Sequence, residues 1–278
     1  SNIIKMSIVY KLENLTTGIV EKRPSQYCKT PYVADVSLDG TSVLVHTPAL
    51  GCCGLCDKTA NILMSPLESK KTKCAYRAEI SVVYEPKIGR NIYIGTNPKL
   101  AETLIFECMK QDKLRFLKNR KSYKREVNIE SADSRFDFAG IDKDGKPYLM
   151  EIKNVPLADY VDMTAKDKKK HDMSVYEDYE YNEKISYFPD GYRKLAKEPI
   201  SPRALKHMNE LANIAEKYSI RCIMCYVIQR SDAKYFQPSV IDPHYREARN
   251  KGVEMYALQF EWNENGEAIL LDEYMEIL

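Results

Sequence analysis

The sequence of 278 residues contains no apolar run that approaches the roughly 20 residues needed to span a bilayer, so no membrane partner is expected. It has no basic N-terminal segment followed by a long apolar stretch, which would mark a secretory signal. We therefore expect an intracellular protein, cytoplasmic or associated with the cell's nucleic acid. Internal repeats and low-complexity segments are also absent. A mean hydropathy of −0.47, with 29% charged and 44% apolar residues, is typical of a globular chain.

Eight cysteines raise the question of disulfides or metal, and an intracellular chain keeps its thiols reduced. Two pairs have C-x-x-C spacing, Cys53 with Cys56 and Cys222 with Cys225. Together they could form a four-thiolate zinc site, which would make the protein a zinc-stabilised interaction module. The second pair, however, lies inside the continuous apolar run IRCIMCYVIQ, where cysteine behaves as a small hydrophobic residue. Core packing is the preferred interpretation for that pair.

Two regions of different pattern divide the chain. Residues 1–75 contain short strand-like runs separated by turn signals, which predicts a small all-β domain. In residues 76–278 runs of strand length alternate with helices, which predicts a mixed α/β domain. Three helices are expected to begin with an N-cap residue followed by proline, at Asn97-Pro98, Ser201-Pro202 and Asp242-Pro243.

Two segments are unusually rich in charge. Residues 110–125 carry a single acid, Asp112, among many basic side chains of the kind that bind nucleic-acid phosphates. A solvated face without a ligand is the alternative. Residues 159–183 are basic first and acidic later, which predicts a surface helix or an insertion. The candidate nucleic-acid contacts in the first segment are Lys118, Arg120, Lys121, Lys124 and Arg125.

The dipeptide Asp144-Gly145 lies between two alternating apolar runs and predicts a β-hairpin. Asp137 and Glu151 are equally far from Asp144, so they should face each other across the hairpin, with Lys153 on the same face. Opposed carboxylates repel, and a hard divalent cation such as Mg²⁺ or Mn²⁺ would relieve that repulsion. Lys153 could then stabilise charge on a phosphate. The alternative is a solvent-facing hairpin in which Lys153 only neutralises the two acids.

Two helical residues extend this candidate site. In the helix that begins at Pro98, Glu107 projects about 20° from Leu100, at the border of the apolar stripe, which makes it the candidate third acidic ligand. His207 projects from the helix that follows Ser201. It is a candidate contact for phosphate or metal, and a surface or hydrogen-bonded structural histidine is the alternative.

Asp137 followed by Glu151-Ile152-Lys153 resembles the PD-(D/E)xK nuclease signature, with Glu107 where that fold carries a helical acid. Nearly the whole chain after residue 30 also resembles the sugar fermentation stimulation protein A family, whose members are described as DNA-binding. The similarity is carried by the segments YVADVSLDG, GTNPKL, SRFDF, MEIKNVPLA, YFPD, RALKHMNEL and IQRSDAKYFQPS. It implies an OB-like β-barrel at residues 1–75 and a PD-(D/E)xK nuclease-like α/β domain at residues 76–278.

The chain departs from the family pattern in its first domain. Cys28 and Pro31 stand where the family usually has arginines, and Ala49 replaces an asparagine. Lys22 and Arg23 are therefore the candidate nucleic-acid contacts there.

These observations lead to one main hypothesis and two rivals. The main hypothesis is a DNA-binding nuclease in which Asp137, Glu151 and Glu107 hold Mg²⁺ or Mn²⁺ and Lys153 stabilises the phosphate charge. The first rival is a non-catalytic DNA-binding or regulatory protein that retains the nuclease fold. The second is the zinc-stabilised interaction module.

Overall fold

The computed structural model describes residues 7–49, 54–190, 195, 197–249 and 252–278. The chain divides into two compact units. Unit 1 comprises residues 1–104, 229–231 and 259–271, and unit 2 comprises residues 105–228, 232–258 and 272–278. The units do not divide at residue 75, because the two strands between residues 76 and 95 pair with the N-terminal strands.

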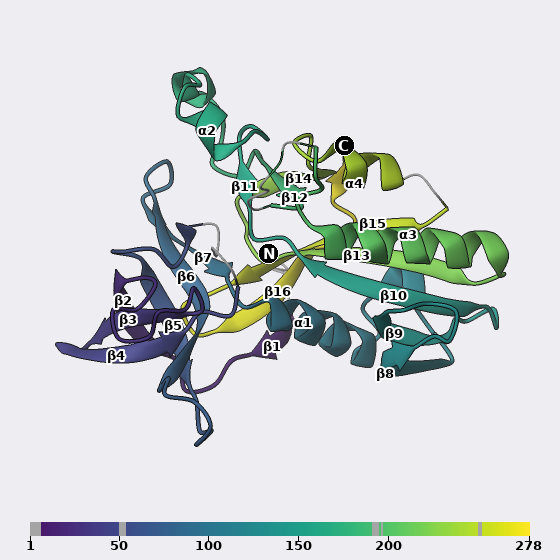
Figure 1. Cartoon of the computed structure of the whole chain (residues 1–278), viewed down its shortest axis with the longest axis horizontal. Coiled ribbons are helices and arrows are strands. Elements are labelled where there is room, and N and C mark those ends of the chain that lie inside the picture. Colours follow the sequence, from purple (N-terminus) through teal and green to yellow (C-terminus); the bar gives the residue numbers. More distant parts are fainter. Residues whose placement is uncertain (1–6, 50–53, 191–194, 196, 250–251) are drawn as a thin grey trace, which may run out of the picture. The chain divides into compact units, whose positions relative to one another are not determined.

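Unit 1 is built around a sheet with the strand order β4-β3-β2-β5-β6-β7 (Figure 1). An additional parallel pairing of β4 with β6, at Val45–Tyr76 and His46–Arg77, closes the strands into a ring of the kind expected for an OB-like barrel. Val36, Val45, Ile62, Met64 and Ala78 are fully buried inside it. The strands are β2 (Thr16–Lys22), β3 (Val33–Leu38), β4 (Thr41–His46), β5 (Asn61–Pro66), β6 (Tyr76–Glu85) and β7 (Arg90–Gly95). The unit also contains the pair β1 (Ile8–Lys11) and β16 (Glu267–Asp272).

Unit 2 carries two sheets. In the larger one β10 lies between β9, its antiparallel hairpin partner, and β13, which runs parallel to it. The smaller sheet has the order β11-β12-β14-β17. The strands of the larger sheet in this unit are β8 (Ser122–Asn128), β9 (Arg135–Ile141), β10 (Pro147–Asn154), β13 (Arg221–Ile228) and β15 (Glu254–Trp262, which ends in unit 1). The strands of the smaller sheet are β11 (Ala158–Asp159), β12 (Lys184–Phe188), β14 (Ala233–Pro238) and β17 (Glu276–Ile277).

The three predicted helix starts are confirmed. They open α1 (Pro98–Lys110), α3 (Pro202–Lys217) and α4 (Pro243–Ala248). The Ser201 side chain accepts a hydrogen bond from Ala204 N, and the Asp242 side chain accepts one from Tyr245 N, so both residues act as N-caps. None of the helices in the described ranges is long and apolar enough to cross a membrane.

Helix α3 lies along β13 and β10 of unit 2 (Figure 1), and its apolar side chains supply much of the core there. Its buried residues Met208 and Leu211 belong to the same apolar cluster as Leu149 of β10 and Met224 of β13. The burial of these side chains fixes which face of α3 meets the sheet, and therefore fixes where His207 on that helix must point.

The second cysteine pair belongs to the core, as preferred from the sequence. Cys222 and Cys225 lie three residues apart on β13, so their side chains point to opposite faces of the sheet and cannot chelate one ion together. Burial raises the pKa of the Cys222 thiol to about 11 and that of Cys225 well above its usual value. Of the first pair, Cys56 is buried in the apolar core of unit 1, and Cys53 lies outside the described residues.

Candidate functional site

The hairpin of β9 and β10 has the predicted register. Its ladder runs from Pro147–Ile141 to Met150–Phe138, and continuing that register sets Asp137 opposite Glu151. The turn is closed by Asp142, whose carboxylate accepts hydrogen bonds from Asp144 N at 2.9 Å and Lys146 N at 2.8 Å. Gly145 has a φ of +83°, a conformation that glycine adopts without a steric penalty.

The hairpin is not solvent-facing, so that alternative is wrong. β13 covers the open edge of β10, and only 4% of Glu151 is exposed. A buried ionised carboxylate is costly unless charged or hydrogen-bonding groups surround it. Its environment therefore determines what this part of the sheet can do.

One oxygen of the Glu151 carboxylate is held by two side chains. Oε1 lies 2.7 Å from Lys153 Nζ on the same strand and 2.6 Å from His207 Nδ1 on α3. Lys153 Nζ is in turn 3.0 Å from His207 Nδ1, and only 5% of His207 is exposed. The structure thus places three predicted site residues in one buried cluster, which we call the Glu151 cluster.

The second oxygen, Oε2, is also buried but has no hydrogen-bond partner among the described residues. An unpartnered buried carboxylate oxygen costs about 1–3 kcal/mol or more, because it has lost water without gaining a donor. A cation or an ordered water would offset that cost. The Glu151 carboxylate is therefore saturated on one side and open to a ligand on the other.

The ionisation state of Glu151 depends on opposing effects on the pKa of its carboxyl group. Burial raises the pKa of its carboxyl, but the hydrogen bond from His207 and the positive charge of Lys153 outweigh burial. The pKa of Glu151 therefore lies below its usual value, and the group is ionised at neutral pH.

The two other predicted acids lie differently. Asp137 is half-buried, and its Oδ2 accepts a hydrogen bond at 2.7 Å from the backbone N of Ile152, next to Glu151 in the chain. The carboxylate of Glu107 instead forms an ion pair at 2.7 Å with Lys110, one turn along its own helix. In the ranges that the structure describes, no three His, Cys, Asp or Glu side chains gather as a metal site.

The basic run separates into structural and exposed side chains. Arg120 is half-buried, bonds to Asp112 Oδ1 at 3.2 Å and to the carbonyl of Met109, and so stabilises the loop after α1. Arg125 is exposed, and its guanidinium lies 4.4 Å from the centre of the Phe106 ring. Three exposed lysines lie before or on the edge strand β8: Lys118, Lys121 and Lys124.

The two candidates in unit 1 also differ from each other. Arg23 donates to Thr47 Oγ1 at 3.0 Å and to the carbonyls of Pro31 and Ala49 at 2.9 and 2.8 Å. Its guanidinium thus fastens the loops of the barrel. Lys22 is the last residue of β2, and its side chain is exposed to solvent.

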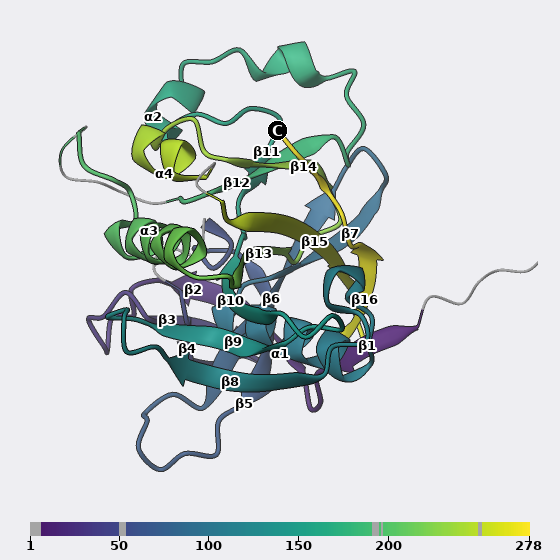
Figure 2. The same cartoon turned by 90° about the vertical axis from the view of Figure 1, so that its right-hand side faces the viewer.

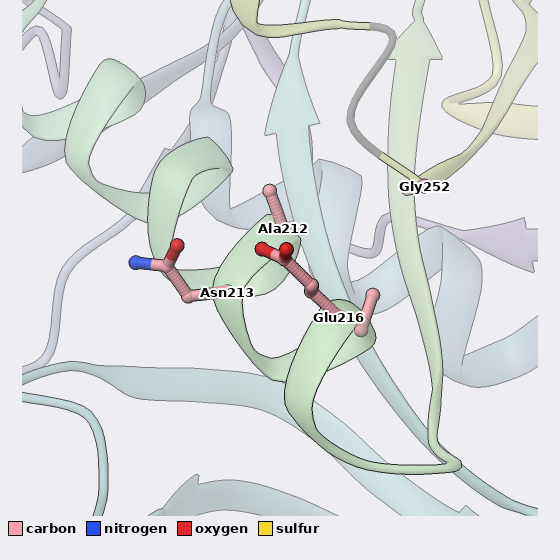
Figure 3. A pocket seen from close by; sticks show the side chains of 5 residues that line it. Ala212, Asn213, Glu216 and Gly252 are labelled. Atoms are coloured by element: carbon pink, nitrogen blue, oxygen red, sulfur yellow. The ribbon is translucent and has the colours of Figure 1, made fainter.

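A hollow along α3 is separate from the Glu151 cluster. It measures about 440 Å³ and is lined by Ala212, Asn213, Ala215, Glu216 and Gly252 (Figure 3). Glu216 follows His207 by nine residues, which is about 180° around a helix, so the hollow and His207 lie on opposite faces. The hollow therefore plays no part in the site.

The charged block is an ordered excursion from the smaller sheet. It contains α2 (Ala165–Lys168) and the short 3₁₀ turn Met173–Tyr176, and in Figure 2 it extends away from β10. Lys168 fastens it through Tyr187 Oη at 2.6 Å and Asp159 Oδ2 at 2.9 Å.

Sequence reasoning missed the link between His207 and Glu151. The sequence made His207 a candidate contact for phosphate or metal, with a hydrogen-bonded structural histidine as the alternative; the structure agrees with that alternative and shows that the partner is Glu151. The signal was present in the spacing, because His207 follows Ala204 by three residues and precedes Leu211 by four, both of which are buried. That spacing places the imidazole on the apolar stripe of α3.

The fold and the Glu151 cluster define a mixed α/β protein with an OB-like barrel in unit 1 and a buried Glu–Lys–His group on the larger sheet of unit 2. The family model described as "Sugar fermentation stimulation protein RE domain" matches residues 99–166 and 178–266, more than half of the sequence. The chain belongs to the sugar fermentation stimulation protein family, which confirms the expected resemblance. Residues 167–177, inside the charged block, fall outside the match.

Individual relatives agree with this. The chain is 28% identical over 268 residues to a sugar fermentation stimulation protein homolog of Crocosphaera subtropica, covering 93% of each protein. It is 26% identical to a homolog of Pseudoalteromonas atlantica, covering 90% of this chain and 92% of that one. The structure of Pyrococcus furiosus SfsA in complex with Ca²⁺ matches with a TM-score of 0.73 at 16% identity, covering 98% and 99% of the chains. This match confirms the mixed α/β fold class, and the closed ring of strands in unit 1 is consistent with the expected OB-like barrel.

Proposed function

We propose that the protein binds nucleic acid, DNA in particular, and hydrolyses its phosphodiester bonds with the help of a divalent metal ion, Mg²⁺ or Mn²⁺. The observation that carries this proposal is the buried, ionised Glu151, which has one oxygen held by Lys153 and His207 and one oxygen without a hydrogen-bond partner in the described part of the chain. A buried charge is costly, and an oxygen of it that lacks a donor adds to the cost, so the open side of Glu151 favours a bound ligand.

The donors present suit a hard cation. Carboxylate oxygens are the ligands that Mg²⁺ and Mn²⁺ prefer, and Mg²⁺ is usually held by one or two carboxylates together with waters and substrate phosphate. Glu151 Oε2 and Asp137 fit that donor set. The carboxylate of Glu107 is engaged by Lys110 on its own helix, so the proposal depends on the first two acids.

The chain's own residues would divide the remaining work. A bound ion would lower the pKa of a water molecule and polarise the phosphate. Lys153, with 14% of its side chain exposed, would supply a positive charge to the phosphate as negative charge develops on it. The hydrogen bond from Ile152 N keeps Asp137 against β10, so that its carboxylate stays beside Glu151 in the sheet.

A cleavage assay tests the proposal. End-labelled single- and double-stranded DNA and RNA are incubated with the protein and Mg²⁺, Mn²⁺ or a chelator. We expect metal-dependent cutting that falls at least tenfold in Asp137→Ala, because Glu151 would then hold the ion alone. His171→Asn, on the charged block, is the control and should cut normally. Hydrolysis that is unchanged in Asp137→Ala would overturn the assignment.

We propose that the exposed lysines Lys118, Lys121 and Lys124 bind the nucleic-acid backbone. Each phosphate contact adds about 0.9 to the slope of log affinity against log salt for double-stranded DNA, so replacing all three by glutamine should reduce that slope by about 2 to 3. Filter binding at several salt concentrations measures it. The matched control is Lys58→Gln, Lys166→Gln and Lys217→Gln combined, which removes the same charge elsewhere. Equal slopes in the two triple variants would mean that the run is merely solvated.

A non-catalytic DNA-binding protein is the second candidate, and one observation favours it. Lys153 and His207 both contact Oε1 of Glu151, and a buried cluster of this kind can also be a purely structural ion pair. This candidate predicts nucleic acid that is shifted in a gel but stays intact in every metal. The cleavage assay therefore separates the two.

A further inference from the structure

His207 differs from the other members of the Glu151 cluster because it comes from a distant part of the chain. It lies on α3, 56 residues from Glu151, and packs against Phe136 with ring centres 6.5 Å apart. Its burial and its neighbours leave the imidazole little freedom to move. A rigid donor is therefore aimed at the carboxylate from the opposite layer of the fold.

The direction of this hydrogen bond follows from charge. The Lys153 ammonium can only donate, so Oε1 at 2.7 Å is an acceptor, and the 2.6 Å contact with His207 requires that Nδ1 carries the proton and donates it to Glu151 Oε1. Nδ1 then has no lone pair for Lys153, and the ammonium of Lys153 also donates to Oε1. Two donors thus meet at one oxygen, while Oε2 receives no hydrogen bond from the residues that the structure describes.

This unequal distribution fixes the carboxylate. If the His207 donor were absent, the carboxylate could rotate toward Lys153 and share both oxygens with its ammonium. With both donors in place, Oε1 is fully hydrogen-bonded, and the lone pairs of Oε2 stay available and point in a fixed direction. Partners of this kind orient metal ligands in many proteins and change metal affinity about 10–100-fold.

We propose that His207 is a positioning residue that holds the Glu151 carboxylate through Nδ1–H, so that Oε2 is presented to a divalent cation. This inference deepens the proposed function and rests on it for the presence of a metal site. His207 itself contacts neither the cation nor the nucleic acid.

The test uses the geometry of amide side chains. Asparagine places its amide nitrogen close to where histidine places Nδ1, whereas glutamine reaches further, toward the position of Nε2. We therefore compare His207→Asn, His207→Gln and His207→Ala with the wild-type full chain. Calorimetric titration with Mn²⁺ and with Ca²⁺ measures binding directly, without reference to cleavage. His171→Asn is the control.

We expect His207→Asn to bind both ions within about threefold of wild type, and His207→Gln and His207→Ala to bind at least tenfold more weakly. Equal affinity in all variants would overturn the inference, as would equal loss in Asn and Gln. Absence of ion binding in the wild-type protein would also overturn it. If the alanine variant does not fold, the Asn–Gln comparison decides alone. Wild-type protein that binds metal but does not cleave would refute the nuclease and leave the role of His207 intact.

Discussion

Lys153→Met is expected to reduce phosphodiester hydrolysis about 10²–10³-fold while leaving divalent-ion binding intact or slightly tighter. The loss follows because one preorganised positive charge at a reacting phosphate is typically worth that much in rate. The affinity should be retained because the Lys153 ammonium donates to Glu151 Oε1, and its removal leaves more negative charge on the carboxylate for a cation. Cleavage rates and calorimetric titration on the same preparation measure the two effects.

The control for this change is Lys206→Met, which removes an exposed lysine that pairs with Asp133 at 3.1 Å. It should alter neither quantity. If Lys153→Met abolished metal binding and cleavage together, Lys153 would be needed for the structure of the metal site, and its effect on cleavage would not come from its charge at the phosphate. Normal cleavage in Lys153→Met would remove the residue from the chemistry altogether.

The hairpin register was predictable from sequence because two local signals agree. The Asp144-Gly145 turn and the period-two alternation together set Asp137 opposite Glu151. The burial of Glu151 was not predictable in the same way. It depends on β13, which pairs with β10 from about 70 residues further along the chain, and on α3, which covers the sheet.

The roles of the basic residues illustrate a second limit. Basic residues are spread throughout residues 110–125, and nothing in the sequence separates their roles. In the structure, however, Arg120 hydrogen-bonds into its own loop while Lys121 is exposed to solvent. A guanidinium can satisfy several acceptors at once, and which acceptors fold toward it is decided by tertiary structure. The exposed lysines are therefore the better candidates for phosphate contacts.

The boundary predicted at residue 75 from local composition differs from the division into two units for a related reason. The polar segment at residues 67–73 looks like a linker, but the strand after it, β6, pairs with β5 and β4 and completes the ring of unit 1. A polar stretch inside a barrel is only the connection between two of its strands. Which neighbour a strand pairs with is set by long-range packing, and local composition does not record it.

Arg221→Met is expected to lower the free energy of unfolding by about 2–3 kcal/mol and the melting temperature by about 5 °C. Arg221 begins β13, beside the strand of Glu151. Its guanidinium donates to both oxygens of Glu254 at 2.9 and 2.8 Å, to Asp142 Oδ2 at 3.2 Å and to the carbonyl of Phe116 at 3.1 Å. Only 18% of the side chain is exposed, so its removal leaves buried acceptors without their donor.

The same ion pairs make the stability dependent on acid. Burial raises the pKa of Asp142, but the backbone N–H groups of Lys146 and Asp144, with Arg221, outweigh it and hold the pKa below its usual 3.8. Burial likewise raises the pKa of Glu254, yet Arg221 and Tyr256 bring it below 4.5. Since both pKa values are depressed in the folded state, their contribution to stability is present above about pH 4.5 and is lost as pH falls through the folded values.

Thermal melts between pH 3 and pH 7 therefore test the network in two ways. The wild-type protein should lose stability steeply below about pH 4.5, and Arg221→Met should lose less, because part of what acid removes is already gone. Arg203→Met, which replaces an exposed arginine on α3, should follow the wild-type curve. Parallel curves for Arg221→Met and wild type would show that the acid sensitivity arises elsewhere.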